Sequence, residues 1–278
     1  MRRRFSLGVL TIAAIVIVLA VGIAVGVYTL LRKAEPFVPT AGCHVKTPDG
    51  ERTLDIEQAQ IAATIAVVGA RRKLPERAIV IAYATAIQES KLFNVTYGDR
   101  DSVGVFQQRE SQGWGSKKKI MDPVYSTNKF FAALVKVKNY RKLPIADAAQ
   151  AVQRSAGGYA YADHEADARI LAAAFTGRVP KAVRCTFVPG KKQTPAPTPK
   201  TGEAQKGLIR ALGAAETDGG RISAPNAKRG WLIAAWSVAH AERYNLRTVA
   251  FDGATWSADR GQDGWKAGKA TNRHVELS

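Results

Sequence analysis

The sequence predicts a mainly α-helical protein in three parts: an N-terminal transmembrane helix, an α-helical domain, and a small α+β C-terminal domain. Three observations lead to this division. The stretch from Leu7 to Leu31 carries no charged residue, the segment 53–185 contains several capped apolar helical patterns, and a proline- and lysine-rich stretch follows at 186–205. The 278 residues are enough for one large domain or two modest ones.

Residues 1–33 are predicted to be a cytoplasmic tip followed by a membrane anchor. Their uncharged stretch spans about 37 Å as a helix, which exceeds the roughly 30 Å hydrocarbon core of a bilayer. A cleavable signal peptide has a shorter apolar region, although the small residues near Ala34 keep that alternative open. The arginines at positions 2–4 outweigh Arg32 and Lys33. We therefore expect a single-pass plasma-membrane protein with its N-terminus in the cytoplasm and its bulk outside.

The net charge of +18 would favour nucleic acid as the partner of a cytoplasmic protein. The sequence has no zinc-finger spacing, no RNA-binding aromatic motif and no basic helix with heptads. An exported domain has other polyanions nearby, such as wall polymers and anionic lipid headgroups. We therefore expect no nucleic-acid partner, and we interpret the charge as favouring solubility and association with the cell surface.

Cys43 and Cys185 flank the predicted helical domain. In an oxidising compartment a bridge between them would close a loop of about 142 residues, worth roughly 4–5 kcal/mol in the chain-entropy model. Two unpaired buried thiols are the alternative. Only four histidines are present, and none has metal-ligand spacing with a cysteine, so we expect no metal site and no cofactor.

A polar stem is predicted at 34–52, followed by two helices. Asp55 and Gln58 form a capping box for a helix that ends near residue 71 and has one apolar face. Pro75 stands in the first turn of a second helix, which runs to about residue 91. Its residues from 78 to 87 are apolar on every face, which is typical of a central helix.

The rest of the chain is predicted to be helical with one strand. A loop or short irregular strand is expected at 94–108, and Asp122-Pro123 supplies an N-cap with proline at the first helical position. Beyond the linker at 186–205, residues 206–278 form the predicted C-terminal domain. Further helices are expected at 122–135, 146–156, 162–175, 206–215 and 231–244, and a strand at 247–251.

Glu89 stands at the end of the buried helix, directly before a Gly/Asp-rich loop. Partial burial and the negative end of the helix dipole both favour the protonated form of such a carboxyl group. A protonated carboxyl group can donate a proton to a glycosidic oxygen. A surface glutamate paired with Arg100 or Arg109 is the alternative. Three small residues precede Glu89 at helical spacing and leave room beside it: Ala82, Thr85 and Ala86.

The residues around Glu89 resemble those of a known superfamily. Glu89-Ser90 followed by Gly104-Val105-Phe106-Gln107 is similar to the paired ES and GLMQ-type motifs of goose-type lysozymes and soluble lytic transglycosylases. The longer pattern QESKLFNVTYGDRDSVGVFQQRESQGWG, with IMDPVYSTNKFF and AAQAVQRSA after it, resembles an actinobacterial, membrane-anchored branch of this lysozyme-like superfamily. Some members of that branch carry the name heavy-metal transporter. The resemblance covers roughly residues 43–185 and implies a lysozyme-like domain at 53–185 that acts on the glycan strands of peptidoglycan.

The resemblance also implies a role for each matched residue. Glu89 is expected to be the general acid/base, and Ser90 to orient its carboxylate or cap the helix. Gly104 is expected to let the backbone approach a sugar, and Gln107 to bond the substrate beside the cleaved bond. The remaining candidates for substrate binding are Gln108, Trp114, Gln153, Tyr159 and Tyr161.

Gln153-Arg154-Ser155 stands where the family has a Tyr-Asn motif. This difference leaves the role of the third motif open, and Tyr159 or Tyr161 is a candidate for the lost aromatic contact. Trp114 lies in a compact Gly-Trp-Gly loop. It is expected either to stack on a sugar or to fill a gap in the core.

The resemblance supports cleavage of the MurNAc–GlcNAc β-1,4 bond and leaves the product open. A hydrolase usually activates water with a second carboxylate, and Asp99 and Asp101 are the nearest candidates in sequence. Both also suit ordinary loop chemistry, because Asp often bonds its own backbone in turns. A lytic transglycosylase needs one acid/base, with the muramic acid 6-hydroxyl as nucleophile, and we favour this reaction.

Two non-enzymatic alternatives remain. A catalytically silent peptidoglycan-binding or scaffold protein could hold glycan in the same groove. A transporter component is the second, but one predicted span whose only polar residues bear hydroxyl groups offers no transport path.

The C-terminal part, Gly230–Trp256 with the final RHVELS, is weakly similar to D-Ala-D-Ala carboxypeptidase-like domains. Those peptidases bind zinc through a Ser-x-His…Asp segment and a terminal His-x-His pattern. Here Ser223-Ala224-Pro225-Asn226 lacks the histidine, and the end reads His274-Val275-Glu276. We therefore expect a noncatalytic structural or wall-binding module. His240 is predicted to be a core or surface histidine and not a ligand.

Overall fold

The computed structural model describes residues 7–33, 41–154, 158–187, 198–268, 271 and 273–278. They belong to two units, Met1–Pro39 and Thr40–Ser278. Helices make up 52% of the structure and strands 16%. The protein therefore contains more helix than strand, as predicted, but it has more sheet than the sequence indicated.

The first unit contains helix α1 (Leu7–Lys33). Its segment Thr11–Thr29 has a mean hydropathy of 2.6 and is long and apolar enough to cross a membrane. A helix that is apolar on all faces is stable where every face contacts lipid or a protein core. The predicted anchor is thus a single continuous helix.

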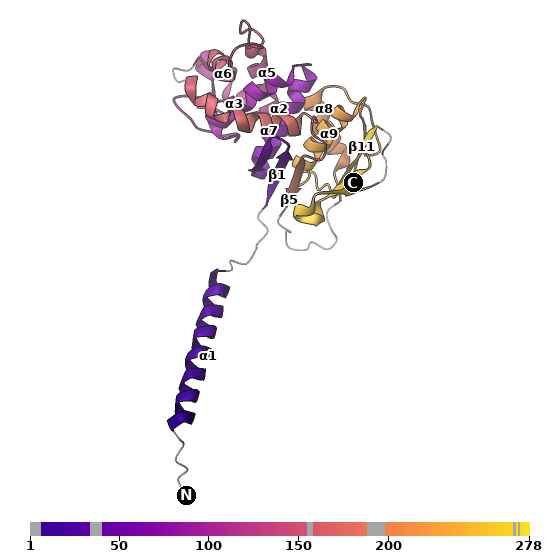
Figure 1. The fold of residues 1–278 in the computed structure, drawn as a ribbon. Helices are drawn as coiled ribbons and strands as arrows, with labels where there is room; N and C mark the ends of the chain where they lie inside the picture. The colour runs from indigo at the N-terminus through magenta and orange to yellow at the C-terminus, as the bar shows by residue number, and fades with distance from the viewer. Residues whose placement is uncertain (1–6, 34–40, 155–157, 188–197, 269–270, 272) are drawn as a thin grey trace. The chain divides into compact units, whose positions relative to one another are not determined.

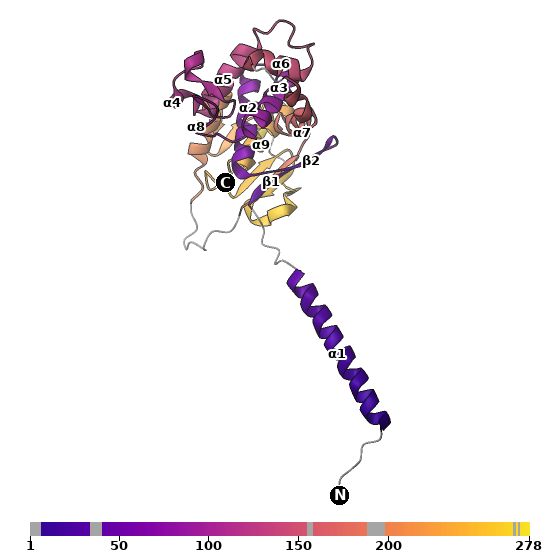
Figure 2. The same cartoon turned by 90° about the vertical axis from the view of Figure 1, so that its left-hand side faces the viewer.

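Helix α2 (Ile56–Arg71) lies at the centre of the second unit (Figures 1 and 2). The Asp55 backbone N–H donates to Gln58 Oε1 at 2.8 Å, as the predicted capping box requires. Residues 61–69 are buried on every side of the helix, so burial extends beyond the face that Ile56, Ala59, Ala63 and Val67 form in the sequence. The helices that cover α2 are α3 (Glu76–Ser90), α5 (Pro123–Leu134), α7 (Glu165–Phe175), α8 (Thr201–Leu212) and α9 (Ala227–Ala239).

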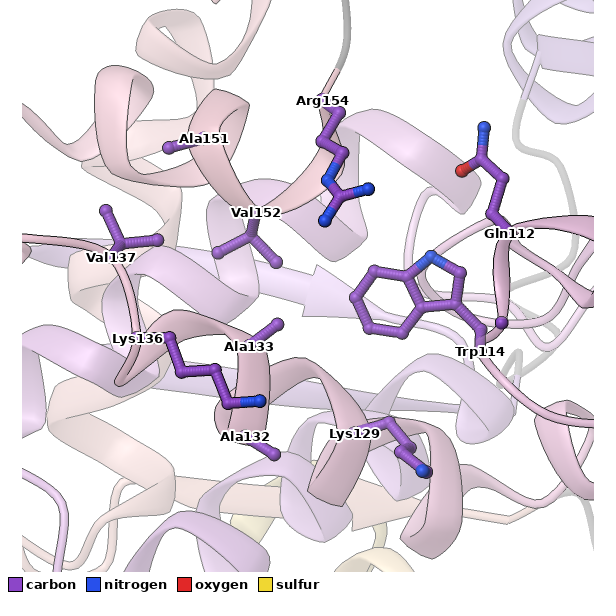
Figure 3. Close-up of a pocket in the computed structure, with 11 residues that line it drawn as sticks. Gln112, Trp114, Lys129, Ala132, Ala133, Lys136, Val137, Ala151, Val152 and Arg154 are labelled. Atoms are coloured by element: carbon purple, nitrogen blue, oxygen red, sulfur yellow. The ribbon is translucent and has the colours of Figure 1, made fainter.

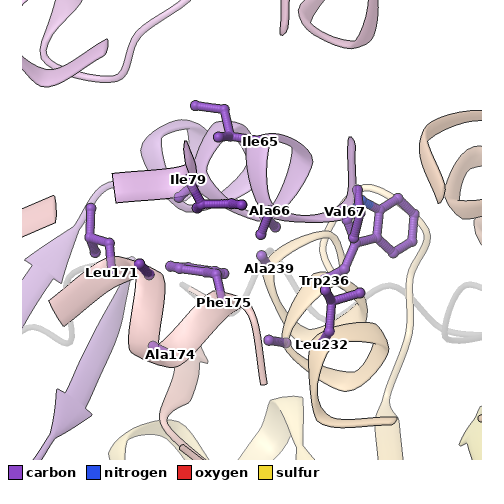
Figure 4. Close-up of a cluster of buried hydrophobic side chains, with 14 of the residues drawn as sticks. Ile65, Ala66, Val67, Ile79, Leu171, Ala174, Phe175, Leu232, Trp236 and Ala239 are labelled. Carbon is purple, nitrogen blue, oxygen red and sulfur yellow. The ribbon is translucent and has the colours of Figure 1, made fainter. Parts of the chain in front are cut away.

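One apolar core joins the helices that precede the predicted linker to those that follow it. Figure 4 shows Phe175 of α7 and Leu232 and Trp236 of α9 gathered around Ala66 and Val67 of α2. The segments 53–185 and 206–278 therefore share a core within one compact unit. The part of the linker at 188–197 lies outside the described residues.

A three-stranded antiparallel sheet closes one side of this core. Strand β1 (Gly42–Thr47) pairs with β2 (Gly50–Leu54) on one edge and with β5 (Val183–Thr186) on the other. The prediction of a polar stem is therefore wrong for residues 42–52. The segment forms a strand because its side chains alternate between the two faces of the sheet: Cys43, Val45 and Thr47 point inward and are buried. Cys43 lies opposite Cys185 in the sheet, and the two form the predicted disulfide.

A six-stranded antiparallel sheet lies in the C-terminal part, in the order β10-β9-β8-β11-β7-β6, with α9 packed against β8 and β11. The predicted strand at 247–251 corresponds to β8. Most of the other strands span only two to four residues, which leaves too little alternation to recognise in the sequence. The strands are β6 (Thr217–Asp218), β7 (Arg221–Ser223), β8 (Thr248–Phe251), β9 (Ala254–Ser257), β10 (Trp265–Ala267) and β11 (His274–Leu277).

Several helix boundaries differ from the predicted ones. Helix α6 ends at Gln153, because Arg154 takes the left-handed conformation with φ 55°. Helix α8 starts at Thr201, inside the predicted linker, and α9 starts after Asn226, whose side chain accepts from the Arg229 backbone N–H at 2.9 Å. The remaining elements are the hairpin β3 (Ser102–Val103) and β4 (Gln108–Arg109), α4 (Lys117–Ile120), α6 (Ile145–Gln153), and the 3-10 helices η1 (Glu110–Gln112), η2 (Gly158–His164) and η3 (Ala258–Asp263).

The disulfide should contribute much of the stability of the second unit, because it closes a 142-residue separation. The double variant Cys43→Ser/Cys185→Ser should lose about 4–5 kcal/mol of unfolding free energy. Urea unfolding of residues 40–278, followed by tryptophan fluorescence, measures the loss. Reductant added to the wild type should reproduce it, and an unchanged urea midpoint in both samples would contradict the prediction.

Candidate functional site

The last turn of α3 carries the carboxylate on which the candidate site depends. Residues 78–86 of α3 are buried, and the helix leaves the core only at its end, where Glu89 is half-buried. Lys91 then takes the left-handed conformation with φ 53° and ends the helix. The core therefore fixes the position of Glu89, although the residue itself lies at the surface.

Glu89 lines a surface groove of about 530 Å³. The start of α2, the end of α3 and the loop that leads to β3 form its walls. Of the other predicted site residues, Ser90 and Gln107 line the same groove. Amide, hydroxyl and aromatic groups beside the carboxylates of Glu57 and Glu89 suit a ligand that needs hydrogen bonds and a stacking face. The complete lining is Glu57, Gln88, Glu89, Ser90, Lys91, Phe93, Asn94, Val95, Tyr97, Gly98 and Gln107.

Ser90 ties the end of α3 to the neighbouring loop. Its hydroxyl lies 2.8 Å from the Val105 carbonyl oxygen and 3.1 Å from that of Ala86. The loop also needs a glycine at position 104, where φ is +79° and a Cβ would lie 3.1 Å from the Ile120 carbonyl oxygen. Ser90 thus holds the loop against the end of α3, while Lys91 occupies the C-cap position.

The two adjacent glutamines point in different directions. Gln107 has φ 46°, and its Oε1 accepts from Ser102 Oγ at 2.9 Å, so the side chain that lines the groove is also part of the loop framework. Gln108 is 1% exposed, and its Nε2 donates to the Ser126 carbonyl at 3.1 Å. Gln108 therefore does not line the groove, contrary to the expectation that it binds substrate.

A buried tyrosine holds the Glu89 carboxylate. The Tyr161 hydroxyl donates to Glu89 Oε1 at 2.7 Å, and the Tyr161 side chain is only 2% exposed. A short hydrogen bond from a buried, immobile group restricts the carboxylate to one orientation. Of the two tyrosines that the sequence offered, Tyr161 makes this contact, and the side chain of Tyr159 lies outside the described residues.

Gln153 supports the groove loop from α6. Its Nε2 donates to the Phe106 carbonyl at 2.8 Å, and the Phe106 ring stacks on Phe130 with 4.5 Å between ring centroids. Gln153 itself does not line the groove. Arg154 faces a separate cavity, and Ser155, the third residue of this motif, lies outside the described residues.

Trp114 lies against the core and lines that separate cavity, which has a volume of about 450 Å³ (Figure 3). Its carbonyl oxygen accepts from the Tyr125 hydroxyl at 3.1 Å. The indole thus fills a gap at the edge of the core with one side and borders a cavity with the other. Trp114 is not part of the groove that contains Glu89.

The two aspartates of the loop differ sharply in their contacts. Asp101 accepts from the Ser111 backbone N–H at 2.8 Å and from Arg109 Nε at 2.7 Å. The Ser111 N–H and then the Arg109 guanidinium hold the pKa of the Asp101 carboxyl well below its usual range. The Asp99 side chain is 91% exposed and lies 3.9 Å from Arg100. Neither aspartate lines the groove, and the bonds of Asp101 fit the loop role.

Glu57 and Gln88 are among the polar residues of the groove that sequence reasoning missed. Glu57 lines it, and its Oε1 accepts from the Asn94 backbone N–H at 3.0 Å. An acidic residue in the first turn of a capped helix is common because of the helix dipole, so its position gave no functional signal. Gln88 Oε1 lies 2.8 Å from His164 Nε2, a pair that 76 positions of sequence separate.

The C-terminal part contains a core histidine. His240 is stacked between Trp236 and Tyr244, and burial lowers its pKa to about 4. It therefore belongs to the core, one of the two placements that the sequence predicts. His274 and Ser223 face each other across β11 and β7. No group of three or more potential metal-ligating side chains is present in the described part of the chain.

The groove loop should be sensitive to a side chain at position 104. Gly104→Ala should cost about 1–2 kcal/mol for the left-handed backbone and about 1–3 kcal/mol more for the contact with Ile120. Gly113 is a matched control, because its φ of +78° is nearly the same and its Cβ would meet nothing within 4 Å. Gly113→Ala should therefore show only the backbone cost. Equal losses for the two variants in urea unfolding would refute the steric argument.

No protein-family model matches the sequence, and the curated proteins contain no match either. The functional assignment consequently depends on the groove, its side chains and the motif pattern around Glu89.

Proposed function

We propose that the chain is a membrane-anchored glycosidase that cleaves peptidoglycan, with Glu89 as the general acid/base. The proposed bond is the MurNAc–GlcNAc β-1,4 linkage, and the proposed reaction is lytic transglycosylation. One observation carries the proposal: the Glu89 carboxylate lies in an open groove while the buried Tyr161 hydroxyl fixes its orientation. A catalytic acid needs both access to substrate and a defined direction.

The surroundings of Glu89 suit a sugar polymer. The groove offers amide and hydroxyl groups for hydrogen bonds, and Phe93 and the 75% exposed Tyr97 provide aromatic faces. Sugars combine hydroxyl groups with flat C–H faces, so both kinds of contact are needed. The groove is open, which allows a strand to enter without a free end.

The choice of transglycosylation is supported by the loop aspartates. Neither Asp99 nor Asp101 lines the groove, so neither is placed to activate a water. In a transglycosylase the same carboxyl group first protonates the leaving oxygen and then, as carboxylate, accepts the proton of the muramic acid 6-hydroxyl. One well-oriented carboxyl group is sufficient for both steps.

Hydrolysis is the second candidate reaction. The observation in its favour is that the Glu57 carboxylate lines the same groove as Glu89. If Glu57 activates a water, the product has a reducing end and not a 1,6-anhydro ring. Mass spectrometry of the released muropeptides distinguishes the two products directly.

The proposed location follows from two features. Helix α1 is long and apolar enough for a single span. The Cys43–Cys185 disulfide is typical of proteins outside the cytoplasm. A domain anchored on the outer side of the plasma membrane would meet the glycan strands of the wall.

Glu89→Gln should abolish cleavage. The amide keeps the shape of the side chain but cannot donate or accept the catalytic proton, so release of soluble muropeptides by the full chain in detergent micelles should fall at least about 100-fold. Glu242→Gln, at an exposed position in the C-terminal part, should cleave like the wild type. A Glu89→Gln variant that digests peptidoglycan as fast as the parent would refute this mechanism.

The same experiment tests the catalytically silent alternative. A scaffold protein would retain insoluble peptidoglycan without releasing soluble fragments, in the wild type and in Glu89→Gln alike. Release of fragments by the wild type alone excludes it.

Tyr161→Phe should slow cleavage about tenfold, with a larger effect on kcat than on KM, because the carboxylate loses its fixed orientation but the groove remains. Tyr83→Phe is the matched control, since Tyr83 is also buried and its hydroxyl donates to the Ala62 carbonyl at 2.7 Å, away from the groove. The two variants should lose similar stability. If Tyr83→Phe slows cleavage as much as Tyr161→Phe, the effect is structural and the proposed role of Tyr161 is wrong.

A further inference from the structure

A second cavity, of about 450 Å³, lies between the loop after β4, helix α5 with the turn that follows it, and the end of α6. Figure 3 shows the Trp114 indole at one side of this space, with the side chains of Arg154 and Lys136 pointing toward it. Small apolar side chains, among them Val137 and Val152, form its floor. The cavity therefore combines an aromatic wall, an apolar floor and a cationic rim.

The rim carries three positive charges that no carboxylate neutralises within the described part of the chain. Lys129, Lys136 and Arg154 line the cavity, and the lining contains no acidic residue. None of the three forms an ion pair with another described residue. Such a cavity favours a ligand with more than one anionic group and an apolar surface.

The cavity and the Glu89 groove share one loop. Gln107 lines the groove and Gln112 lines the cavity, and five extended residues span at most about 18 Å. Gln153 also links the two, because it bonds the Phe106 carbonyl while the next residue, Arg154, lines the cavity. A single extended polymer could therefore contact both places at once.

We infer that this cavity binds the carboxylates of the peptide stem carried by the glycan strand in the groove. The inference rests on the proposed function, because that function supplies a polymer whose every second sugar bears a peptide with free carboxylates. Lys129, Lys136 and Arg154 pair with these carboxylates, and Trp114 and the valines contact the alkyl side chains of the peptide. The cavity thus selects glycan that still carries peptides.

The test compares two substrates and two variants of the full chain in detergent micelles. The substrates are peptidoglycan with intact peptide stems and the same material after an amidase has removed them. The first variant is Lys129→Gln/Lys136→Gln. The control is Lys138→Gln/Lys142→Gln, which removes the same charge from exposed positions that do not line the cavity.

The wild type should cleave the peptide-bearing material at least about tenfold faster than the stripped material. Lys129→Gln/Lys136→Gln should lose most of this preference and keep the wild-type rate on stripped glycan, and the control should behave like the wild type. A preference that survives in Lys129→Gln/Lys136→Gln, or that falls equally in the control, overturns the inference. Equal rates of the wild type on both substrates overturn it too, while leaving the proposed function intact.

A binding measurement separates failure of the inference from failure of the proposed function. If the wild type cleaves neither substrate, the proposed function is wrong, and calorimetry with a soluble disaccharide-tetrapeptide then decides the inference. Binding that weakens about tenfold in Lys129→Gln/Lys136→Gln supports it. Absence of binding to the wild type refutes it, as does tighter binding of inorganic polyphosphate, which would identify a phosphate polymer as the occupant.

Discussion

The burial of α2 on all of its faces is the constraint from which the rest of the fold follows. A helix with a single apolar face can lie on the surface of a domain, whereas one that is buried along residues 61–69 needs neighbours on every side. The helices before the linker cover only part of it. Helices α8 and α9 supply the remainder, which makes the C-terminal part a structural component of the same core.

The groove takes its rigidity from that core. Two bonds from helices and one within the loop fix it: Ser90 of α3 to the Val105 carbonyl, Gln153 of α6 to the Phe106 carbonyl, and the Gly104 N–H to the Val95 carbonyl at 2.7 Å. These bonds hold the loop of the candidate site in place from within the protein.

Short sequence patterns were sufficient to predict α2, α5 and the capping box at Asp55, because the capping residues and apolar positions of each lie close together in the sequence. They failed for β1, whose partner strand β5 carries the cysteine 142 positions later. The roles of Gln107 and Gln108 could not be separated either, because the sequence does not show that Gln107 takes a left-handed backbone conformation. The contact of Tyr161 with the groove carboxylate spans 72 positions, and the sequence left two tyrosines open.

The position of the disulfide has a mechanical consequence. Cys43 lies in the first strand of the second unit, so tension that enters this unit from its N-terminal side reaches the Cys43–Cys185 link before it reaches the helices. The hydrogen bonds between β1 and β5 could break one after another. The disulfide, however, has to break before β1 can separate from β5. The link therefore keeps the first strand of the unit in its sheet when the chain is pulled from the N-terminal side.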